Sequence, residues 1–386
     1  MNPQDLWLRP AGVADLPALE RIAASSVHGI GSLPKNPQRL LRRLELAEQS
    51  FQSEDVASGE ESYLFLLEWQ GRVIGCSGIA ASAGFRERFY SYRNEFMVHA
   101  SKGLHVNKRM HTLHLCHDLT GSTLLTSFFI EPEFEDTVAP ELLSRARLLF
   151  IRRFADRFPG PRVAAEMPGI SDGEGHSPFW SAVGERFFKM SYPEAERVSE
   201  GRSRSLIADL MPRTPVYVGL LPPAAQMSIG QLHPVGQLPF EILFREGFEA
   251  DTYVDVFDAG PTVVAHLDQI ATVRAARSLT VQGAGAGQGP LDGGSSGSNK
   301  VSSQRPGLDQ ERPRAQARSA DAPPAWGLMV AGDRCSFRAC LGLLPTSGTL
   351  PADSEAARRL GVKAGERVDV TPLQLDDVAQ EDGDEA

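Results

Sequence analysis

Apolar residues recur along this 386-residue chain with two spacings, that of helices and that of strands. Apolar positions three or four residues apart predict amphipathic helices at residues 14–25, 37–51 and 140–153. Short apolar runs predict strands, and residues 70–72 predict a tight hairpin between two of them. These runs are residues 6–10, 63–69, 73–79, 124–130 and 163–167. The mixture of helices and strands predicts an α/β (α+β) fold.

An aromatic-rich helical pattern occurs twice, at residues 178–188 and 239–248. Each copy has a glycine and a phenylalanine at or near its end, and we expect each to lead into an apolar strand. This ending resembles the segment that closes the core of the acetyltransferase (GNAT) superfamily fold. We therefore predict two acetyltransferase-like lobes, at residues 1–195 and 196–280.

The predicted second lobe is shorter than the first, with helical turns at residues 205–211 and 223–229 and a strand at residues 253–257. Residues 281–325 are rich in Gly, Ser, Ala and Pro, which predicts a disordered linker. Apolar runs return in residues 326–373 and predict a small β-rich module. Residues 374–386 form an acidic tail.

The composition narrows the class of protein. A formal net charge of −10 argues against nucleic acid and anionic membranes as partners. No apolar run reaches the roughly 18 residues of a membrane span, and the first residues lack a signal-peptide pattern. The spacings of the cysteines and histidines fit neither a disulfide framework nor a metal site. The expectation is a reduced, cytoplasmic protein without a bound metal.

Residues 124–140 would bind the acyl-CoA in a fold of this superfamily. A strand such as residues 124–130 holds the pantetheine, and N–H groups at the start of the next helix hold the pyrophosphate. The turn between them, residues 131–140, has four carboxylates, no glycine before its final proline, and no N–H on that proline. Four negative charges would repel a pyrophosphate, so this turn argues against an ordinary CoA site. An ordinary acidic loop before a helix is the alternative.

Four polar residues are candidates for chemistry or substrate binding. His233 precedes a proline and is therefore extended, and an imidazole with a pKa near 6.5 can donate or accept a proton. Arg93 could bind a substrate carboxylate in a bidentate manner, while Glu95 and Asp118 could meet a cationic group. The alternatives are a structural or surface histidine and the exposed charges of an amphipathic strand.

Nine short motifs follow one another along the chain, among them Ser-Pro-Phe-Trp at residues 177–180 and Gly-Gln-Leu-His-Pro at residues 230–234. The other seven are residues 83–85, 89–95, 98–101, 116–121, 185–188, 208–212 and 257–262. Together they resemble the arginine N-succinyltransferase family, and most of all its branch of alpha subunits of arginine/ornithine succinyltransferase. The resemblance is dense from about residue 6 to residue 278 and looser in the C-terminal module.

The resemblance implies the first step of arginine catabolism by the succinyltransferase route. Succinyl-CoA and L-arginine, with L-ornithine as a second acceptor, would give the N2-succinyl amino acid and free CoA. By motif, His233 corresponds to the proton donor of the family, and Leu125 with Thr126 corresponds to its contact with succinyl-CoA. The resemblance also implies a hetero-oligomer with a homologous beta subunit.

One departure from the family pattern leaves alternatives open. Single-subunit members carry an Arg-x-x-Gly-x-Gly turn where this chain has residues 135–140, whereas the alpha branch is similar to this chain in lacking it. Either CoA is held differently here, or the intact site lies on the beta subunit. The chain would then be a catalytically weak or silent subunit that supports an active partner. Acylation of another amine, such as a polyamine or a protein lysine, is a third alternative.

Overall fold

The computed structural model describes residues 2–25, 33–54, 58–85, 87–172, 174–199, 210–283, 325–346 and 348–374. Its strands are β1 (Leu6–Pro10), β2 (Ser62–Trp69), β3 (Arg72–Ala80), β4 (Ser91–Ser101), β5 (Val106–Cys116), β6 (Thr123–Ile130), β7 (Arg162–Glu166), β8 (Val216–Tyr217), β9 (Glu249–Val254), β10 (Pro261–His266), β11 (Arg277–Gln282), β12 (Trp326–Ala331), β13 (Arg338–Leu343), β14 (Thr349–Pro351) and β15 (Arg367–Pro372). Within these described ranges they form one sheet in the order β14-β11-β15-β12-β13-β1-β2-β3-β6-β7-β10-β9-β4-β5-β8.

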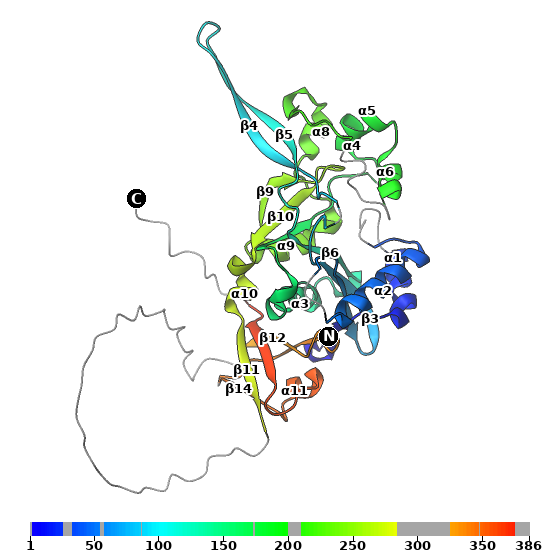
Figure 1. Ribbon diagram of the computed structural model, residues 1–386, viewed down its shortest axis with the longest axis vertical. Helices are drawn as coiled ribbons and strands as arrows, with labels where there is room; N and C mark the ends of the chain where they lie inside the picture. Colours follow the sequence, from blue (N-terminus) through cyan, green and yellow to red (C-terminus); the bar gives the residue numbers. More distant parts are fainter. Residues whose placement is uncertain are drawn as a thin grey trace, which may run out of the picture.

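Helices lie against this sheet, so the predicted α/β class is confirmed (Figure 1). They are α1 (Leu16–Ser25), α2 (Pro37–Gln52), α3 (Ala139–Arg153), α4 (Pro178–Ala182), α5 (Gly184–Phe188), α6 (Tyr192–Ser199), α8 (Pro223–Ser228), α9 (Gln237–Arg245), α10 (Ala271–Ala275) and α11 (Glu355–Leu360). The hairpin between β2 and β3 is also confirmed. Gln70 and Gly71 both have positive φ, 50° and 78°, as a two-residue turn that follows the strand twist requires.

The helices α2 and α3 show how the spacing of apolar residues determines which side of a helix is buried. Asn36 begins α2, because its side chain accepts hydrogen bonds from the N–H groups of Gln38 and Arg39. Leu40 and Leu44 then point into the core, and each buried leucine contributes roughly 1.5–3 kcal/mol. Helix α3 is buried along most of its length, including the polar residues Ser144, Arg145 and Arg147. It is therefore the central helix of the molecule rather than a surface helix.

The main core gathers around the ring of Phe150 in α3. Its centroid lies 5.9 Å from that of Phe51 in α2, 5.0 Å from that of Phe65 in β2, and 5.0 Å from that of Phe337, just before β13. Aromatic pairs at such distances add about 0.5–1.5 kcal/mol each beyond their burial. The C-terminal strands thus share a core with the first helices and strands.

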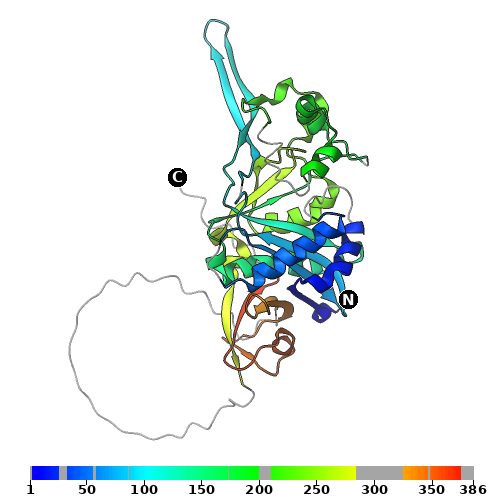
Figure 2. The same cartoon turned by 45° about the vertical axis from the view of Figure 1, so that its right-hand side comes forward.

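The sheet joins strands from different predicted lobes. Strand β10 pairs with β7, β9 pairs with β4, and β13 pairs with β1. Strand β11 pairs with β14 and β15, which follow the predicted linker, and it ends at Gln282, so the first two residues assigned to the linker belong to a strand instead. In Figures 1 and 2 the C-terminal strands and α11 lie at one end of the molecule, and the β4–β5 hairpin extends from the other. The predicted domain boundaries themselves stay a prediction.

The two aromatic-rich helical patterns have different outcomes. The second copy forms α9, ends at Gly247 with φ of 92°, and leads through Phe248 into β9, as predicted. The first copy forms α4 and α5 but leads into α6, so the expected strand after it is wrong. The reason is that Trp180 stacks on both Phe188 and Phe257, with ring centroids 5.9 and 5.4 Å apart, and the segment packs as a local helical cluster.

Several predictions fall outside the described residues. These are residues 284–324 of the linker predicted at 281–325, residues 375–386 of the tail predicted at 374–386, and most of the helical turn predicted at residues 205–211. The other predicted turn of the second lobe is observed as α8. The strand predicted at residues 253–257 begins and ends earlier, as β9, because Asp255 accepts hydrogen bonds from the next N–H groups and starts a turn.

Candidate functional site

The candidate site begins where strands β6 and β7 part. The two strands are parallel and pair through Thr123 and Leu124, so Leu125 is the first β6 residue beyond the paired part. Near this point β6 has one more residue than β3 opposite it, and Ser127 has φ of 55°. Such a bulge bends a strand and changes the direction of its backbone groups. Leu125 and Thr126, the predicted acyl-CoA contacts, therefore lie at the opening of the sheet.

Two arginines surround this bulge, a part-buried one in α2 and a buried one in α3. Arg43 of α2 donates hydrogen bonds to the hydroxyl groups of Thr126, at 3.3 Å, and Ser127. Arg147 of α3 donates to the Thr126 carbonyl at 3.4 Å and to the Ser144 hydroxyl at 3.0 Å. Burial lowers the pKa of both guanidinium groups, that of Arg147 to about 9. The bulge thus lies between two positive charges.

Arg147 has an unusual electrostatic position. It is 2% exposed, and among the residues that the structure describes no carboxylate lies within ion-pair distance of it. Burying a charge without a counter-charge is costly, by several kcal/mol even after relaxation. A group that keeps such a charge beside an open strand is suited to an anionic ligand.

His233 lies at the carboxyl end of β7. Its N–H donates to the Pro168 carbonyl at 2.9 Å, and the preceding residue forms a β-bridge with Gly169. Its Nδ1 accepts a hydrogen bond from the Val235 N–H at 3.3 Å, which leaves Nε2 as the nitrogen that carries the proton in the neutral ring. Partial burial lowers the pKa of His233, so the neutral form prevails at pH 7.

A buried carboxylate fixes the backbone beside His233. Asp258 accepts hydrogen bonds from the Gly169 N–H at 2.9 Å, the Tyr192 hydroxyl at 3.1 Å and the Gly260 N–H at 2.8 Å. A Cβ on Gly260 would lie 2.3 Å from the Met167 carbonyl oxygen, so this close approach requires glycine. The position of the imidazole is therefore set by a rigid loop.

The three predicted substrate residues Arg93, Glu95 and Asp118 do come together, but they satisfy one another. Arg93 donates to Glu95 through Nε and to Asp118 through Nη1, the latter at 2.7 Å. Tyr253 also donates to Asp118, at 3.4 Å. The cluster lies at the base of the β4–β5 hairpin, where one guanidinium already faces two carboxylates. Its role in substrate binding stays a prediction.

The acidic turn before α3 is built without an anion site. Thr137 accepts a hydrogen bond from the Ala139 N–H at 3.2 Å, and Pro140 in the first turn has no N–H to offer. Glu131 is neutralised by Arg21 and Arg72, whereas Glu135 and Asp136 are exposed. The start of α3 therefore presents negative charge where a pyrophosphate would need N–H donors.

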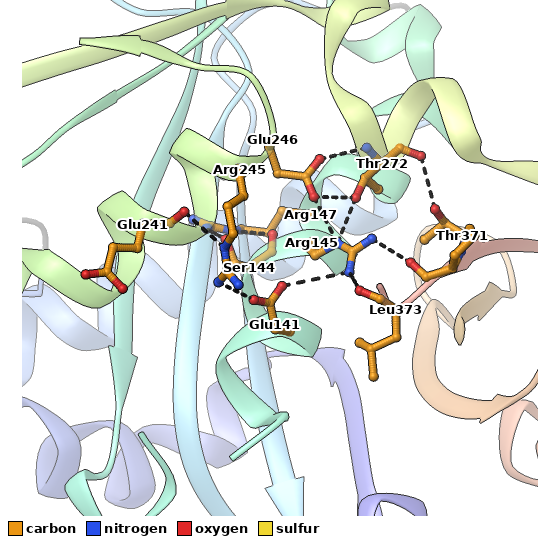
Figure 3. Close-up of polar contacts among 11 residues, drawn as sticks. Glu141, Ser144, Arg145, Arg147, Glu241, Arg245, Glu246, Thr272, Thr371 and Leu373 are labelled. Carbon is orange, nitrogen blue, oxygen red and sulfur yellow. Dashed lines mark hydrogen bonds and ion pairs between the residues drawn. The ribbon is translucent and has the colours of Figure 1, made fainter. Parts of the chain in front are cut away.

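Helix α3 also anchors the C-terminal strands, as Figure 3 shows. Arg145 forms an ion pair with Glu246 at 2.9 Å, and both side chains are 1% exposed. The same guanidinium donates to Thr272 at 2.8 Å and to the carbonyls of Pro372, at 2.7 Å, and Leu373, at 2.6 Å. Burial raises the pKa of Glu246, and Arg145 opposes this shift. This network joins α3, the end of α9, α10 and β15.

Among the described residues, no three His, Cys, Asp or Glu side chains are grouped so as to hold a metal ion. In the same ranges, no helix is both long enough and apolar enough to cross a membrane.

Comparison with known proteins decides the family. A family profile described as "Arginine N-succinyltransferase beta subunit" matches residues 6–272. The chain is 49% identical to arginine N-succinyltransferase subunit alpha of Pseudomonas aeruginosa, over 75% of this chain and 85% of that protein. It is 37% identical to subunit beta of the same organism, over 95% of this chain and 98% of that protein. The chain belongs to the arginine N-succinyltransferase family.

A solved structure agrees with this assignment. The structure of arginine/ornithine succinyltransferase subunit AI from Pseudomonas aeruginosa is 39% identical to this chain, with a TM-score of 0.78. The match covers 96% of this chain and 99% of that one. The predicted family is thus confirmed, including the C-terminal strands, where the motifs were sparse.

For this member of the arginine N-succinyltransferase family, the sequence analysis missed both arginines at the β6 bulge, Arg43 and the buried Arg147. A signal for one of them was present. Arg145 and Arg147 are two positions apart on one helix, which places them about 200° apart around its axis. Since α3 carries apolar residues on most sides, two such arginines cannot both reach solvent. At least one of them had to be buried with a special role.

Proposed function

We propose that this chain transfers the succinyl group of succinyl-CoA to the α-amine of L-arginine, with L-ornithine as a second acceptor, in the first step of arginine catabolism. The single observation that supports this most is the opened strand at Leu125 with His233 at the end of the neighbouring strand, in a member of this family. The reaction consumes a coenzyme thioester, so we place it in the cytoplasm. We also propose a hetero-oligomer with a homologous beta subunit, since relatives of both kinds match the chain.

In the proposed mechanism the deprotonated amine attacks the thioester carbonyl carbon, and the C–S bond breaks as the C–N bond forms. The backbone N–H at Leu125 stabilises the negative charge that develops on the carbonyl oxygen. The Nε2–H of His233 passes its proton to the departing sulfur, and the proton lost by the amine restores the ring. No covalent enzyme intermediate is needed.

We propose that Arg147 binds the distal carboxylate of the succinyl group. Its guanidinium lies next to Thr126, one residue beyond the proposed carbonyl contact, and it has no carboxylate partner in the described ranges. A charge-assisted hydrogen bond to a carboxylate in such a dry site is about twice as strong as a neutral one. This residue would distinguish succinyl-CoA from acetyl-CoA.

A second candidate function is a supporting subunit that is itself weakly active or silent. The observation that favours it is the start of α3, where Glu135 and Asp136 are exposed, Pro140 has no N–H, and the Ala139 N–H already donates to Thr137. In that case the intact CoA site would lie on the beta subunit, and this chain would stabilise it.

The decisive experiment measures thiol release from succinyl-CoA when arginine is added, for this chain alone and mixed with a homologous beta subunit. We expect release by the chain alone, and a loss of about 10²–10⁴-fold in the His233→Gln variant, the usual contribution of a general acid. His266→Gln, which changes an exposed histidine at the end of β10, is the matched control and should keep full activity.

Each outcome of this experiment is informative. If the chain alone releases no thiol but raises the activity of the beta subunit, the supporting role is correct and direct catalysis is wrong. If the His233→Gln variant releases thiol as fast as the unchanged chain, the transferase function is retained and His233 is not the proton donor.

A further inference from the structure

The β4–β5 hairpin extends beyond the rest of the sheet (Figures 1 and 2). Strand β9 pairs with β4 at Tyr92 and Arg93, and β8 pairs with β5 at Thr112 and Leu113. Beyond these pairs, residues 96–111, which we call the hairpin arm, continue as two strands alone. An isolated two-stranded hairpin is at best marginally stable in water. A ribbon of this length is therefore expected to gain stability from a further contact.

One face of the hairpin arm is already covered. Met97 and Met110 are opposite each other in the ribbon. The Tyr217 hydroxyl of β8 lies 3.6 Å from the Met97 sulfur, and a Cβ on Gly219 would lie 3.5 Å from the terminal methyl of Met110. Strand β8 and the turn after it thus shield this face.

The opposite face and the tip carry apolar side chains in water. Phe96 and Val98 are 53% and 66% exposed, and Leu104 at the tip is 76% exposed. Phe96 is held in place by His111, whose ring stacks on it at 5.2 Å, and by Arg109, 4.0 Å from its ring centroid. A pre-ordered apolar face of this kind is typical of a protein–protein contact, because little side-chain freedom is lost on binding.

The charge of the hairpin arm indicates which kind of partner it can bind. The hairpin arm contains Lys102, Lys108 and Arg109 and no carboxylate, while the whole chain has a formal charge of −10. Arm and body are therefore oppositely charged within one molecule. Two copies can satisfy this charge difference reciprocally about a two-fold axis, each arm against the other body.

We propose that the hairpin arm docks on the acidic body of a second copy of this chain and forms a symmetric dimer. The apolar face around Phe96 and Val98 would form the centre of the contact, and the basic side chains its rim. This dimer is separate from the proposed reaction, because no residue of the arm belongs to the opened strand or to the loop of His233.

Sedimentation velocity of the purified full chain tests the proposal. The unchanged chain should sediment as a dimer, and high salt should weaken the dimer because rim charges are screened. The double variant Val98→Asp/Leu104→Asp should be a monomer with the same far-UV circular dichroism as the unchanged chain, since both side chains lie outside the core. Met227→Asp on α8 is the matched control, because this apolar side chain is also 76% exposed, and it should remain a dimer.

Three results would overturn the proposal. The unchanged chain could be a monomer on its own, including the case in which it assembles only with a homologous subunit. The double variant could remain a dimer. Alternatively, Met227→Asp could dissociate the dimer as completely as the arm variant does, which would place the contact elsewhere.

Discussion

At the scale of single residues, the most consequential feature is a positive charge buried beside an irregular strand. Arg147 donates to the Thr126 carbonyl and to Ser144 but has no carboxylate partner in the part of the chain that the structure describes. Natural cores seldom keep a charge that has no counter-charge. A substrate that brings its own carboxylate would explain why this one persists.

Replacing Arg147 should therefore change donor selectivity. We expect Arg147→Met to lower the rate with succinyl-CoA about 10–100-fold, since a hydrogen bond to a charged group contributes about 1.5–3 kcal/mol. The rate with acetyl-CoA, which has no distal carboxylate, should change little. Thiol release with both donors, measured in a preparation active with succinyl-CoA, makes the comparison. Arg152→Met on the same helix is the control, because Arg152 is part-exposed and donates to the Ala276 carbonyl instead. An equal loss with both donors would contradict the assigned role.

At the scale of elements, α3 shows both what the sequence predicts and what it leaves out. Apolar spacing predicted its position to within one residue, because helix periodicity is a local property. The same is true of β6, whereas α9 begins two residues before the predicted pattern and still has the predicted glycine ending. The pairing of β11 with β14 and β15, by contrast, joins residues far apart in the chain, and no local pattern encodes such a register.

In the candidate site, too, some features were predicted from the sequence and others were not. His233 and Leu125 were found through motifs, whereas the loop held by Asp258 and the environment of the β6 bulge depend on contacts between distant segments. Arg93, Glu95 and Asp118 were predicted as substrate contacts, and their mutual ion pairs could not be read from their positions in the chain. The strand expected after the first aromatic helix failed because tertiary stacking of Trp180 on Phe257 took precedence over a local likeness.

The buried ion pair on α3 should matter far more than an exposed one close by. Arg145→Met leaves Glu246 buried without its partner, and breaking such a pair costs about 3–5 kcal/mol. Arg245→Met removes the Arg245–Glu141 pair, whose arginine is 63% exposed, and should cost no more than about 1 kcal/mol (Figure 3). Urea unfolding of both variants gives the two free energies. Equal losses would mean that the Arg145 network does not hold the C-terminal strands.

The turn before α3 gives a second test at this scale. Changing Pro140 to Gly adds the one missing N–H, changing Val138 to Gly removes a side chain at the start of α3, and changing Glu135 to Arg replaces an exposed negative charge by a positive one. We expect CoA to bind at least tenfold more tightly, about 1.4 kcal/mol, by calorimetry. Glu133→Gln, which removes one charge from the same turn without adding an N–H, should have a smaller effect. If the restored turn binds CoA no better than the original, the turn does not face the coenzyme.

At the scale of the whole molecule, one sheet runs from the C-terminal strands through the acyltransferase-like core to the base of the hairpin arm. Helix α3 crosses its middle and contacts both the opened strand and the C-terminal strands. The region proposed for chemistry and the region proposed for assembly are therefore parts of one rigid framework rather than separate modules.

The placement of β11 has a practical consequence for anyone who wishes to dissect this protein. Strand β11 ends at Gln282, and its neighbours β14 and β15 come after residue 325. A polypeptide severed between residues 283 and 325 would yield two fragments that each hold part of the same hydrogen-bonded ladder. They should co-purify as a nicked complex. Expressing only the first fragment would instead leave the backbone N–H and C=O groups at the edges of β1 and β11 without their partner strands. Such exposed edges promote aggregation, so we expect this fragment to be insoluble.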